Sequence, residues 1–451
     1  MKSVKWRYSN ESVQWAEKDT EQGSETDKVN LLLTGEEFQP MYGFGACFNE
    51  LGYRALNILE PDQQEDVMRE LFLPGEDRCN FNFCRLPIGA NDYAESWYSL
   101  AEEPGDFELK HFSIERDKKC LLPYIRQAAK YAPDLKLFAS PWSPPTWMKF
   151  PAVHNYGKLI KTEKNLKAYA DYFVRFIQAY QEEGIAIEQL HPQNEPVADQ
   201  KFPSCMWTGE ELRDFIKLYL GPAFKKAGIN TEIWLGTINA PGCDYKNQIF
   251  EKWATEDYDY FANVVLTDAD ALQYISGVSY QWGGKNAIQR TFESWWPEIR
   301  LMQSENECGY GDNTWEYARY IWTMLKHYIS NGAESYLYWN MILKPWGVST
   351  WGYPQNAMIT IDPETKNVIY NPDFYVMKHY SSPIKRGAVR LGIKGSFAGD
   401  SLVFRNPDGS VVIEAFNPFP KVFPVVFEMG AQRYRFVLEP LSVNSIVLFE
   451  G

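Results

Sequence analysis

Residues 166–196 read LKAYADYFVRFIQAYQEEGIAIEQLHPQNEP, and this stretch decides the fold. Apolar residues recur every three to four positions over 166–184, which predicts an amphipathic helix. The following IEQLHPQNE (187–195) begins as an apolar run and predicts a buried strand. That strand ends in the polar run HPQNEP (191–196). A helix that leads into a buried strand with a polar end is typical of a parallel α/β sheet.

Eight segments of the middle of the chain have this strand pattern, and helical stretches such as 209–228 lie between most of them. The candidate strands are 42–48, 81–87, 135–140, 187–195, 232–236, 275–282, 300–305 and 334–340. Eight short strands over about 300 residues predict an α/β fold of the (β/α)₈ TIM-barrel type. A doubly wound open sheet is the alternative, but GFGACF in the first strand is not the GxGxxG of a phosphate loop.

Both ends of the chain have a different pattern, with short alternating runs broken by turn residues. These runs include VNLLLTG near the start and VVIEAFNP near the end, and Pro-Asp-Gly at 407–409 is a hairpin signal. We therefore expect a β-sandwich side domain formed from both termini, residues 1–38 and 384–451. Residues 39–383 would form the catalytic barrel.

Charge and composition restrict the partners. The chain has 45 basic and 59 acidic residues and a net charge of −14, which argues against nucleic acid or an anionic membrane and favours a neutral substrate. Aromatic residues make up 16% of the chain, more than a core needs, and predict rings on a binding surface. The seven cysteines and five histidines have no metal-type spacing, so we expect free thiols and no metal site.

The sequence contains no apolar run long enough to span a bilayer, so we expect no membrane insertion. The opening MKSVKWRYSNES has no apolar run after its lysines and does not resemble a secretory signal. We expect a cytoplasmic protein, or a secreted or periplasmic one if a leader has been removed.

Two glutamates end predicted strands. Glu195 stands before Pro196, which disfavours a helical conformation and predicts an extended Glu195. Glu305 ends the strand 300–305. Functional side chains of a barrel lie at the carboxyl ends of its strands, so the two predict the pair of carboxylates that glycoside hydrolysis needs. A solvated turn residue is the alternative for Glu195.

Glu307 is a second candidate on the same segment. It has the same parity as Glu305, so both would face the same way on an extended strand. Glu305 lies nearer to the strand end and is preferred, with Glu307 as a supporting acid.

The second strand ends in RLPIGAND (85–92). Arg85 is expected to keep a nucleophilic carboxylate ionised by its positive charge. Asp92 is expected to accept hydrogen bonds from sugar hydroxyls. A structural ion pair between Arg85 and Asp92 is the alternative.

Aromatic and amide residues follow several strand ends, and their recurrence predicts a sugar-binding cleft. For each ring alone, core packing is the alternative. Besides Arg85 and Asp92, the candidate substrate-binding residues are Trp142, Asn194, Tyr280, Gln281, Trp339, Asn340 and Trp346.

The ordered motifs resemble glycoside hydrolase family 30. They are GFGACFNE (43–50), CRLPIGANDY (84–93), FASPWSPPTWMK (138–149), HPQNEP (191–196) and QSENECG (303–309). The resemblance covers essentially the whole chain and implies a (β/α)₈ barrel with a sandwich from both termini, a retaining mechanism and no cofactor.

The resemblance also implies roles for single residues. Glu195 would be the acid/base and Glu305 the nucleophile. The residues that match sugar contacts of the innermost subsite are Arg85, Asp92, Trp142, Asn194 and Trp339.

The chain departs from the family pattern at two places. The sixth strand usually ends in His-x-Tyr, whereas Tyr280-Gln281-Trp282 stands here. The nucleophile segment has one residue more before Cys308 than the glucosylceramidase pattern. Glu307 is therefore an alternative to Glu305 as the nucleophile. The segments SENECG (304–309) and PSCMWTGEELRDF (203–215) are closer to β-1,6-glucanases.

We therefore predict a retaining β-glycosidase that acts on β-glucosides or short β-glucans, as a β-glucosidase, a β-1,6-glucanase or a glucosylceramidase-like enzyme. A β-xylanase with the same pair of acids is the first alternative. A carbohydrate-binding protein without catalysis and a transglycosylase are the others.

Overall fold

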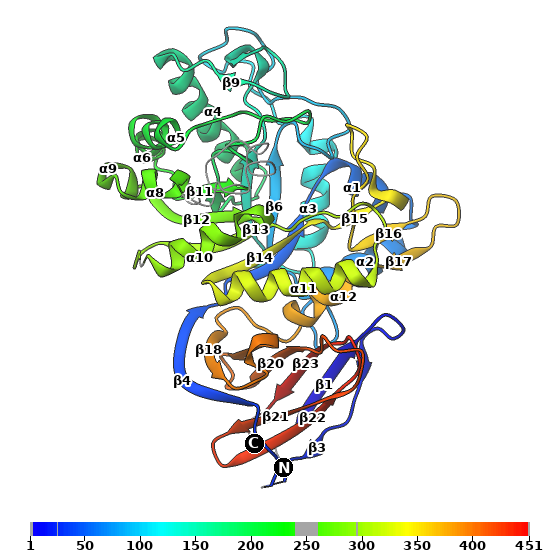
Figure 1. Ribbon diagram of the computed structural model, residues 1–451. Helices are drawn as coiled ribbons and strands as arrows, with labels where there is room; N and C mark the ends of the chain where they lie inside the picture. Colours follow the sequence, from blue (N-terminus) through cyan, green and yellow to red (C-terminus); the bar gives the residue numbers. More distant parts are fainter. Residues whose placement is uncertain (1–2, 25, 240–259, 295, 450–451) are drawn as a thin grey trace.

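The computed structural model describes residues 3–24, 26–239, 260–294 and 296–449. Eight strands close into a parallel barrel in the order β10-β11-β12-β13-β14-β5-β6-β7 (Figure 1). These strands are β5 (Gly43–Cys47), β6 (Phe83–Ile88), β7 (Lys136–Pro141), β10 (Gln189–Leu190), β11 (Glu232–Ile238), β12 (Ile275–Gln281), β13 (Arg300–Glu305) and β14 (Ala333–Asn340). The predicted (β/α)₈ barrel is confirmed, with β10 shorter than the expected 187–195.

Helices cover the outside of the barrel (Figure 1). They are α1 (Glu50–Leu56), α2 (Pro61–Phe72), α3 (Leu121–Ala129), α4 (Glu163–Glu182), α5 (Gly209–Phe215), α6 (Gly221–Ala227), α8 (Tyr260–Leu266), α9 (Ala269–Leu272), α10 (Lys285–Glu293), α11 (Trp315–Ser330) and α12 (Pro372–Ser381). The expected helix 209–228 is divided into α5, a π-helical turn at Ile216–Leu220 and α6. None of the described helices combines the length and the apolar character needed to cross a bilayer.

Helix α4 shows how the pattern becomes structure. The Thr162 side chain accepts the backbone N–H of Asn165 and so caps the first turn. Tyr169, Phe173 and Phe176 recur at three- to four-residue spacing and are buried against the barrel. The helix is followed by Gly184, whose φ of 77° suits glycine and turns the chain toward β10.

The barrel interior is filled by side chains. One buried cluster consists of Phe83, Phe138, Trp234, Met302 and Leu337, which come from five different strands. This plug fills the barrel interior, so polar residues at the carboxyl ends of the strands are reached from that end.

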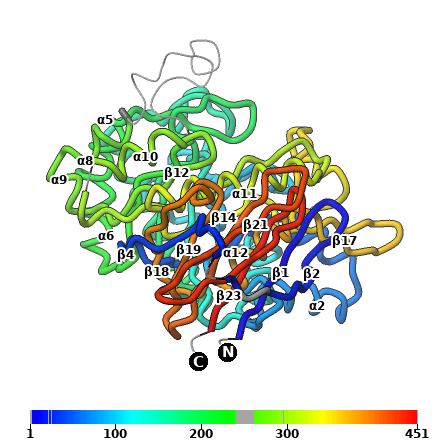
Figure 2. The backbone as a smooth tube through the Cα atoms, turned by 60° about the horizontal axis from the view of Figure 1, so that its bottom comes forward, coloured from blue at the N-terminus to red at the C-terminus, as the bar shows by residue number. Residues whose placement is uncertain are grey.

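The two ends of the chain form the side domain, and both termini lie together at its far end (Figures 1 and 2). Its strands are hydrogen-bonded in the order β2-β1-β23-β20-β19-β18-β4-β21-β22-β3. They are β1 (Val4–Ser9), β2 (Ala16–Glu17), β3 (Glu21–Gln22), β4 (Leu31–Pro40), β18 (Val389–Lys394), β19 (Ser401–Arg405), β20 (Val411–Phe416), β21 (Phe423–Met429), β22 (Gln432–Leu438) and β23 (Val443–Leu448).

Both halves of this sheet contribute to one apolar core, so the sheet folds over on itself. Trp6 and Ile446 from one half lie in the same buried cluster as Phe427 and Phe436 from the other. Strand β4 joins the halves because it pairs with β18 on one edge and β21 on the other. β4 also runs across residues 38–39, where we expected the boundary between the side domain and the barrel. The exact domain boundaries therefore stay predictions.

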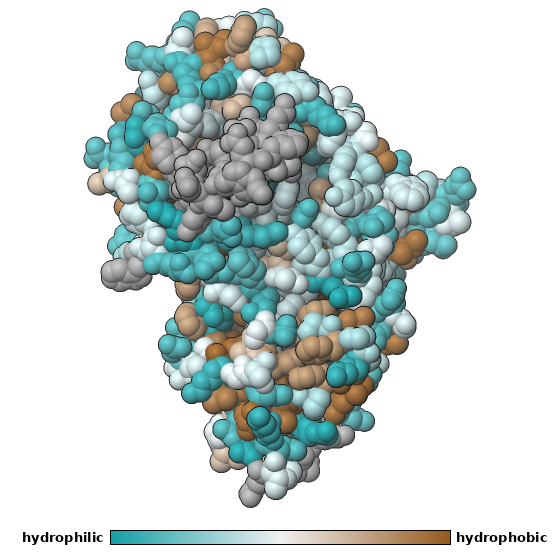
Figure 3. Space-filling model, in the orientation of Figure 1, coloured by the Kyte–Doolittle hydropathy of each residue, from teal (hydrophilic) through white to brown (hydrophobic). Residues whose placement is uncertain are grey.

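Short strands occur in the loops at the barrel mouth. They are β8 (Lys149–Phe150), β9 (Lys158–Leu159), β15 (Ile342–Leu343), β16 (Ile359–Ile361) and β17 (Val368–Tyr370). Hydrophobic side chains gather on the surface near β9 (Figure 3), where Phe150, Val153 and Ile160 are exposed. The six described cysteines carry free thiols, and Cys243 lies outside the described residues.

A cavity of about 570 Å³ lies between the side domain and the barrel, away from the predicted site residues. Four of its charged lining residues are paired with one another, Lys5 with Glu76 and Arg7 with Asp77. We therefore assign it no ligand.

A buried histidine joins the barrel to the side domain. His379 of α12 is hydrogen-bonded to Ser9 of β1 at 2.9 Å and to Ser445 of β23 at 2.7 Å. Ser445 in turn donates to Glu414 of β20 at 3.0 Å. Burial lowers the pKa of His379 to about 3, so the ring is neutral in the folded protein at neutral pH.

Replacing this histidine tests the interface. We expect His379→Ala to lower the free energy of unfolding by about 2–4 kcal/mol at pH 7, because two buried hydroxyls lose a partner and a cavity forms. The exposed His111 provides the control substitution His111→Ala. Urea denaturation of the three proteins measures the difference, and equal midpoints would contradict the role of His379.

The same comparison predicts a pH dependence. The pKa of His379 in the folded protein lies below its ordinary value of 6.5. As the pH falls, the unfolded chain therefore binds a proton at His379 before the folded protein does. The contribution to stability is full above about pH 6.5 and is lost toward pH 3. Between pH 7 and pH 5 the wild type should therefore lose about 2 kcal/mol more than His379→Ala.

Candidate active site

Arg85 lies at the centre of the site, at the carboxyl end of the barrel. Its side chain is fully buried and forms an ion pair with Glu305. The second guanidinium nitrogen, Nη2, donates to Asn194 Oδ1 at 2.7 Å and to Ser140 Oγ at 2.8 Å. A buried guanidinium needs a counter-ion and hydrogen-bond acceptors, and Glu305 and the two neutral side chains provide them. The described residues contain no ion pair between Arg85 and Asp92.

Amide and hydroxyl groups extend this network. Gln281 Nε2 donates to Glu305 Oε2 at 3.1 Å and to Asn194 Oδ1 at 2.8 Å. Thr237 Oγ1 donates to the same Asn194 oxygen at 3.0 Å. Asn194 Oδ1 thus accepts from three side chains, which fixes the orientation of the amide and leaves its NH₂ group on the opposite side.

Two bulges bring the key side chains into the barrel. Between β12 and β13, Tyr280 pairs with Gln303 but Gln281 pairs with Glu305, so Ser304 is an extra residue. Met302 lies in the interior plug, and strict alternation from it would point Glu305 outward. The extra residue reverses this alternation and places Glu305 beside Gln281. A similar shift on β11, between Leu235 and Ile238, accompanies the inward Thr237.

The conformation of Glu195 corrects the prediction of an extended residue. Its φ is 48°, in the left-handed region. The backbone N–H of Glu195 donates to the Thr237 carbonyl at 2.9 Å, and its own carbonyl accepts from Ala198 N–H at 2.9 Å. These tertiary hydrogen bonds override the local preference imposed by Pro196, and a strained backbone of this kind typically costs about 1–3 kcal/mol.

The two carboxyl groups have different surroundings. Burial and the charges of Glu305 and Asp92 raise the pKa of Glu195 well above its usual range, with only weak opposition from Arg85. Burial also raises the pKa of Glu305, but the charge of Arg85 and its hydrogen bond lower it. Arg85 and Gln281 both donate to Glu305. The pKa of both carboxyl groups is raised, but Arg85 opposes the rise more strongly at Glu305, so a proton on the pair is favoured on Glu195.

Two tryptophans enclose the guanidinium of Arg85. Its Cζ lies 4.4 Å from the ring centre of Trp142 and 5.5 Å from that of Trp339. The rings themselves are 5.4 Å apart and tilted by 35°. Both are almost completely buried, so they form apolar walls of the site and position the cation at the same time.

Asp92 belongs to the same electrostatic group. It is 7% exposed, and burial together with the charge of Glu305 raises its pKa to about 7. The indole N–H of Trp351 donates to Asp92 Oδ2 at 3.4 Å. Oδ1 is buried with no hydrogen-bond partner among the described residues, which is the arrangement expected of an acceptor that awaits a ligand hydroxyl.

Three predicted substrate contacts are not part of the Arg85 hydrogen-bond network, and the structure corrects the prediction for Tyr280. Its side chain points away from the barrel axis, and its hydroxyl is hydrogen-bonded to Thr291 of α10 at 2.7 Å. Asn340 Nδ2 donates a hydrogen bond to Gln355 Oε1 at 2.8 Å and so positions the loop that contains Gln355. Trp346 is 67% exposed and lies outside the buried group.

Glu307 lies apart from Glu305. It accepts a hydrogen bond from Tyr320 of α11, and its charge acts on Lys285 of α10. The shared parity of the two glutamates did not place them together, because the strand ends at Glu305 and the chain turns after it.

Sequence reasoning missed two residues of the network. Ser140 and Thr237 both accept from Arg85, at 2.8 Å and 3.5 Å. Small hydroxyl residues at strand ends are common and carry no distinctive spacing. Their positions at the ends of the third and fifth barrel strands were the only available signal.

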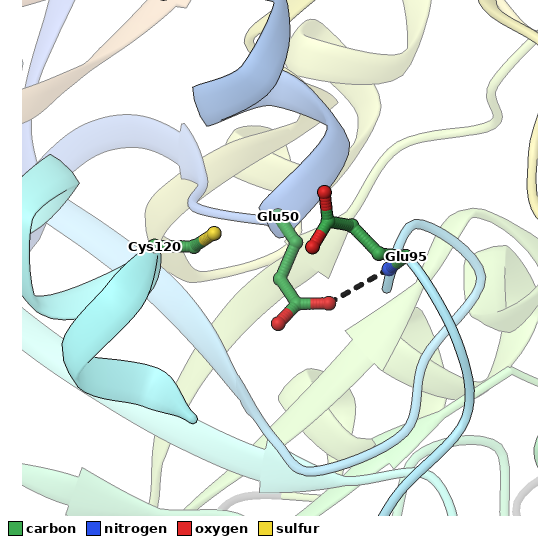
Figure 4. Close-up of side chains that lie close together, drawn as sticks. All are labelled: Glu50, Glu95 and Cys120. Carbon is green, nitrogen blue, oxygen red and sulfur yellow. Dashed lines mark hydrogen bonds between the residues drawn. The ribbon is translucent and has the colours of Figure 1, made fainter. Parts of the chain in front are cut away.

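A second polar cluster consists of residues from the start of α1, the segment after β6 and the start of α3 (Figure 4). Possible ligand atoms of Glu50, Glu95 and Cys120 lie within 4.8 Å of one another. Arg116 already binds both oxygens of Glu50, at 3.0 Å and 2.8 Å, and Arg54 binds Glu95 at 2.6 Å. The cluster therefore acts as a structural ion-pair group, because arginine occupies the oxygens that a metal would need.

Comparison with known proteins identifies the family. Residues 41–384 match the glycosyl hydrolase family 30 TIM-barrel domain. The chain belongs to glycoside hydrolase family 30. It is a glycoside hydrolase, as the ordered motifs predicted.

Relatives within the family carry different names. Putative glucosylceramidase 2 of Caenorhabditis elegans is 30% identical over 413 residues, which cover 86% of this chain and 76% of the relative. An endo-1,6-β-D-glucanase of Aspergillus fumigatus is 25% identical, over 91% of this chain and 85% of its own. A solved endo-β1,6-glucanase superposes with a TM-score of 0.86 at 25% identity, covering 99% of this chain and 100% of its own.

The electrostatic coupling in the site is directly measurable. Glu305→Gln removes a negative charge beside Glu195 and should lower the pKa of Glu195 by about one unit or more. Glu307→Gln is the matched control, because Glu307 contacts Tyr320 instead. Carbon-13 NMR titration of labelled glutamate side chains measures both effects, and equal shifts in the two variants would refute the proximity of Glu195 and Glu305.

Proposed function

We propose that the protein is a retaining β-glycosidase that hydrolyses β-glucosidic bonds by double displacement, with Glu305 as the nucleophile and Glu195 as the acid/base. The observation that carries this proposal is the asymmetry of the two carboxyl groups. Glu305 is bound by the Arg85 cation and by Gln281, whereas Glu195 is buried near two other acids.

This asymmetry matches the two roles. An ionised Glu305 attacks the anomeric carbon and forms a glycosyl-enzyme, while Glu195 gives its proton to the departing oxygen. Once Glu305 is bonded to the sugar its charge is gone, so the pKa of Glu195 falls and Glu195 accepts a proton from the attacking water. Water then releases the sugar with the anomeric configuration it had at the start, and Glu305 regains its charge beside Arg85.

The other residues position the sugar. Trp142 and Trp339 supply apolar ring surface, and Asp92 Oδ1 and the Asn194 NH₂ group supply polar contacts. The similarity to proteins named glucosylceramidases and endo-1,6-β-D-glucanases supports a β-glucoside as substrate. A β-xylanase would use the same two acids, so a panel of aryl β-glycosides separates the alternatives.

Replacing the nucleophile tests the assignment. We expect Glu305→Gln to lower kcat on aryl β-glucosides at least about a thousandfold. The melting temperature should also fall, because the buried Arg85 loses its counter-ion, so far-UV circular dichroism at the assay temperature checks that the variant is folded. Glu307→Gln should stay within about threefold of the wild type. If Glu305→Gln stays active while Glu307→Gln is inactive, the nucleophile is Glu307, and proton NMR showing an α-configured first product would exclude retention.

Replacing the acid/base gives a leaving-group signature. Glu195→Ala should lower kcat/KM on alkyl glucosides at least about a hundredfold, but much less on dinitrophenyl glucosides, because their phenolates depart without a proton. The alkaline limb of the pH profile should also disappear, since it reports the loss of the Glu195 proton. Equal losses on both substrates would contradict the role.

A further inference from the structure

Asp92 connects the site to an aromatic surface at the barrel mouth. One of its oxygens, Oδ2, is held by the Trp351 indole N–H, whereas Oδ1 has no partner among the described residues. The backbone N–H of Thr350 also donates to the Asp92 carbonyl at 2.9 Å. The loop after β14 is thus fastened to the loop after β6 at the edge of the sugar site.

Four rings continue outward from this point and are called the ring ladder: Phe202, Trp351, Tyr353 and Tyr310. Trp351 and Tyr353 stack at 5.0 Å with an interplanar angle of 9°. Tyr353 meets Tyr310 at 6.4 Å, and Phe202 lies 5.6 Å from Trp351. The rings come from the loops after β10, β13 and β14, so three separate strand ends contribute to one surface.

The outermost ring is open to solvent yet firmly held. Tyr310 is 66% exposed and lies five residues after Glu305. The next residue, Gly311, has a φ of 82°, and its N–H donates to Asn356 Oδ1 at 2.9 Å. An exposed ring on an anchored backbone loses little conformational freedom when a ligand stacks on it.

Trp351 has a different part in the ladder. Tyr353 covers one face of its indole, and the Lys201 ammonium lies 4.9 Å from its ring centre. Its N–H donates to Asp92, so Trp351 connects the sugar site to the outer rings.

We propose that the ring ladder is an outer sugar-binding subsite, which receives a second glucosyl unit of a β-glucan chain while the first lies at Asp92. This inference rests on the proposed function. The flat Tyr310 ring suits the apolar face of a pyranose, and the ladder is continuous with the acid that awaits a hydroxyl. The enzyme therefore prefers oligosaccharides to simple monoglucosides.

The test compares substrates of different length. We would measure kcat/KM for β-1,3-, β-1,4- and β-1,6-linked gluco-oligosaccharides of two to five units and for β-glucosyl fluoride, whose leaving group is too small to stack on a ring. Tyr310→Ala should lower kcat/KM about five- to tenfold on the best oligosaccharides and leave the fluoride within twofold. Tyr310→Phe keeps the ring and should retain wild-type values.

Phe419→Ala is the matched control, because Phe419 is an exposed aromatic residue of the side domain, 40% exposed. It should change neither class of substrate. Equal kcat/KM of wild type and Tyr310→Ala on every oligosaccharide would overturn the subsite, and so would an equal loss on β-glucosyl fluoride.

Calorimetric binding separates failure of the subsite from failure of the proposed function. If the wild type hydrolyses no glucoside, the proposed function fails, and the subsite is judged by affinity for the same oligosaccharides. Weaker binding by Tyr310→Ala than by Tyr310→Phe would support the ladder. Equal affinity, or no binding of any oligosaccharide by the wild type, would overturn it.

Discussion

The buried ion pair between Arg85 and Glu305 is the interaction on which the site depends. Removing a guanidinium and a carboxylate from water is costly, and their attraction offsets the cost only when the remaining donors and acceptors are satisfied. Here Ser140 and Asn194 accept from Arg85, and Gln281 donates to Glu305. Four barrel strands and the segment after β10 must therefore close in one register for the charges to be tolerated. The barrel register that brings these partners together therefore also provides the cation and the donor that favour a charged Glu305.

The same pair sets the difference between the two acids. A single cation close to one of two neighbouring carboxyl groups is enough to divide their roles, because the proton moves to the group without the cation. The left-handed Glu195 backbone contributes by turning that residue away from the regular strand path, where the Thr237 carbonyl holds its N–H. Two features of the barrel, a buried arginine and an irregular strand end, thus give chemically identical side chains the different surroundings that the proposed mechanism needs.

Local pattern predicted the barrel because its strands are mostly apolar runs with polar residues at or after their ends, and periodicity reports this directly. It also predicted Arg85, Glu195 and Glu305, whose positions at strand ends are visible in the sequence. The sequence pattern did not predict the direction of the side chains near those strand ends. A bulge at Ser304 inverts the alternation of β13, and a similar register shift between Leu235 and Ile238 accompanies the inward Thr237 of β11. Tertiary hydrogen bonds to neighbouring strands decide these directions, and no local signal encodes them.

The two ends of the barrel carry different constraints. The side domain is fastened to the barrel through buried groups such as His379, Ser9 and Ser445, so substitutions there act mainly on stability. At the carboxyl end, the inner residues are fixed by the Arg85 network, whereas the rings beyond Asp92 come from three loops that contribute nothing to barrel closure. Loop residues can change without disturbing the ion pair. Relatives named for different substrates can therefore share one fold, since in the proposed mechanism the inner site performs the cleavage while the loops are free to vary with the substrate.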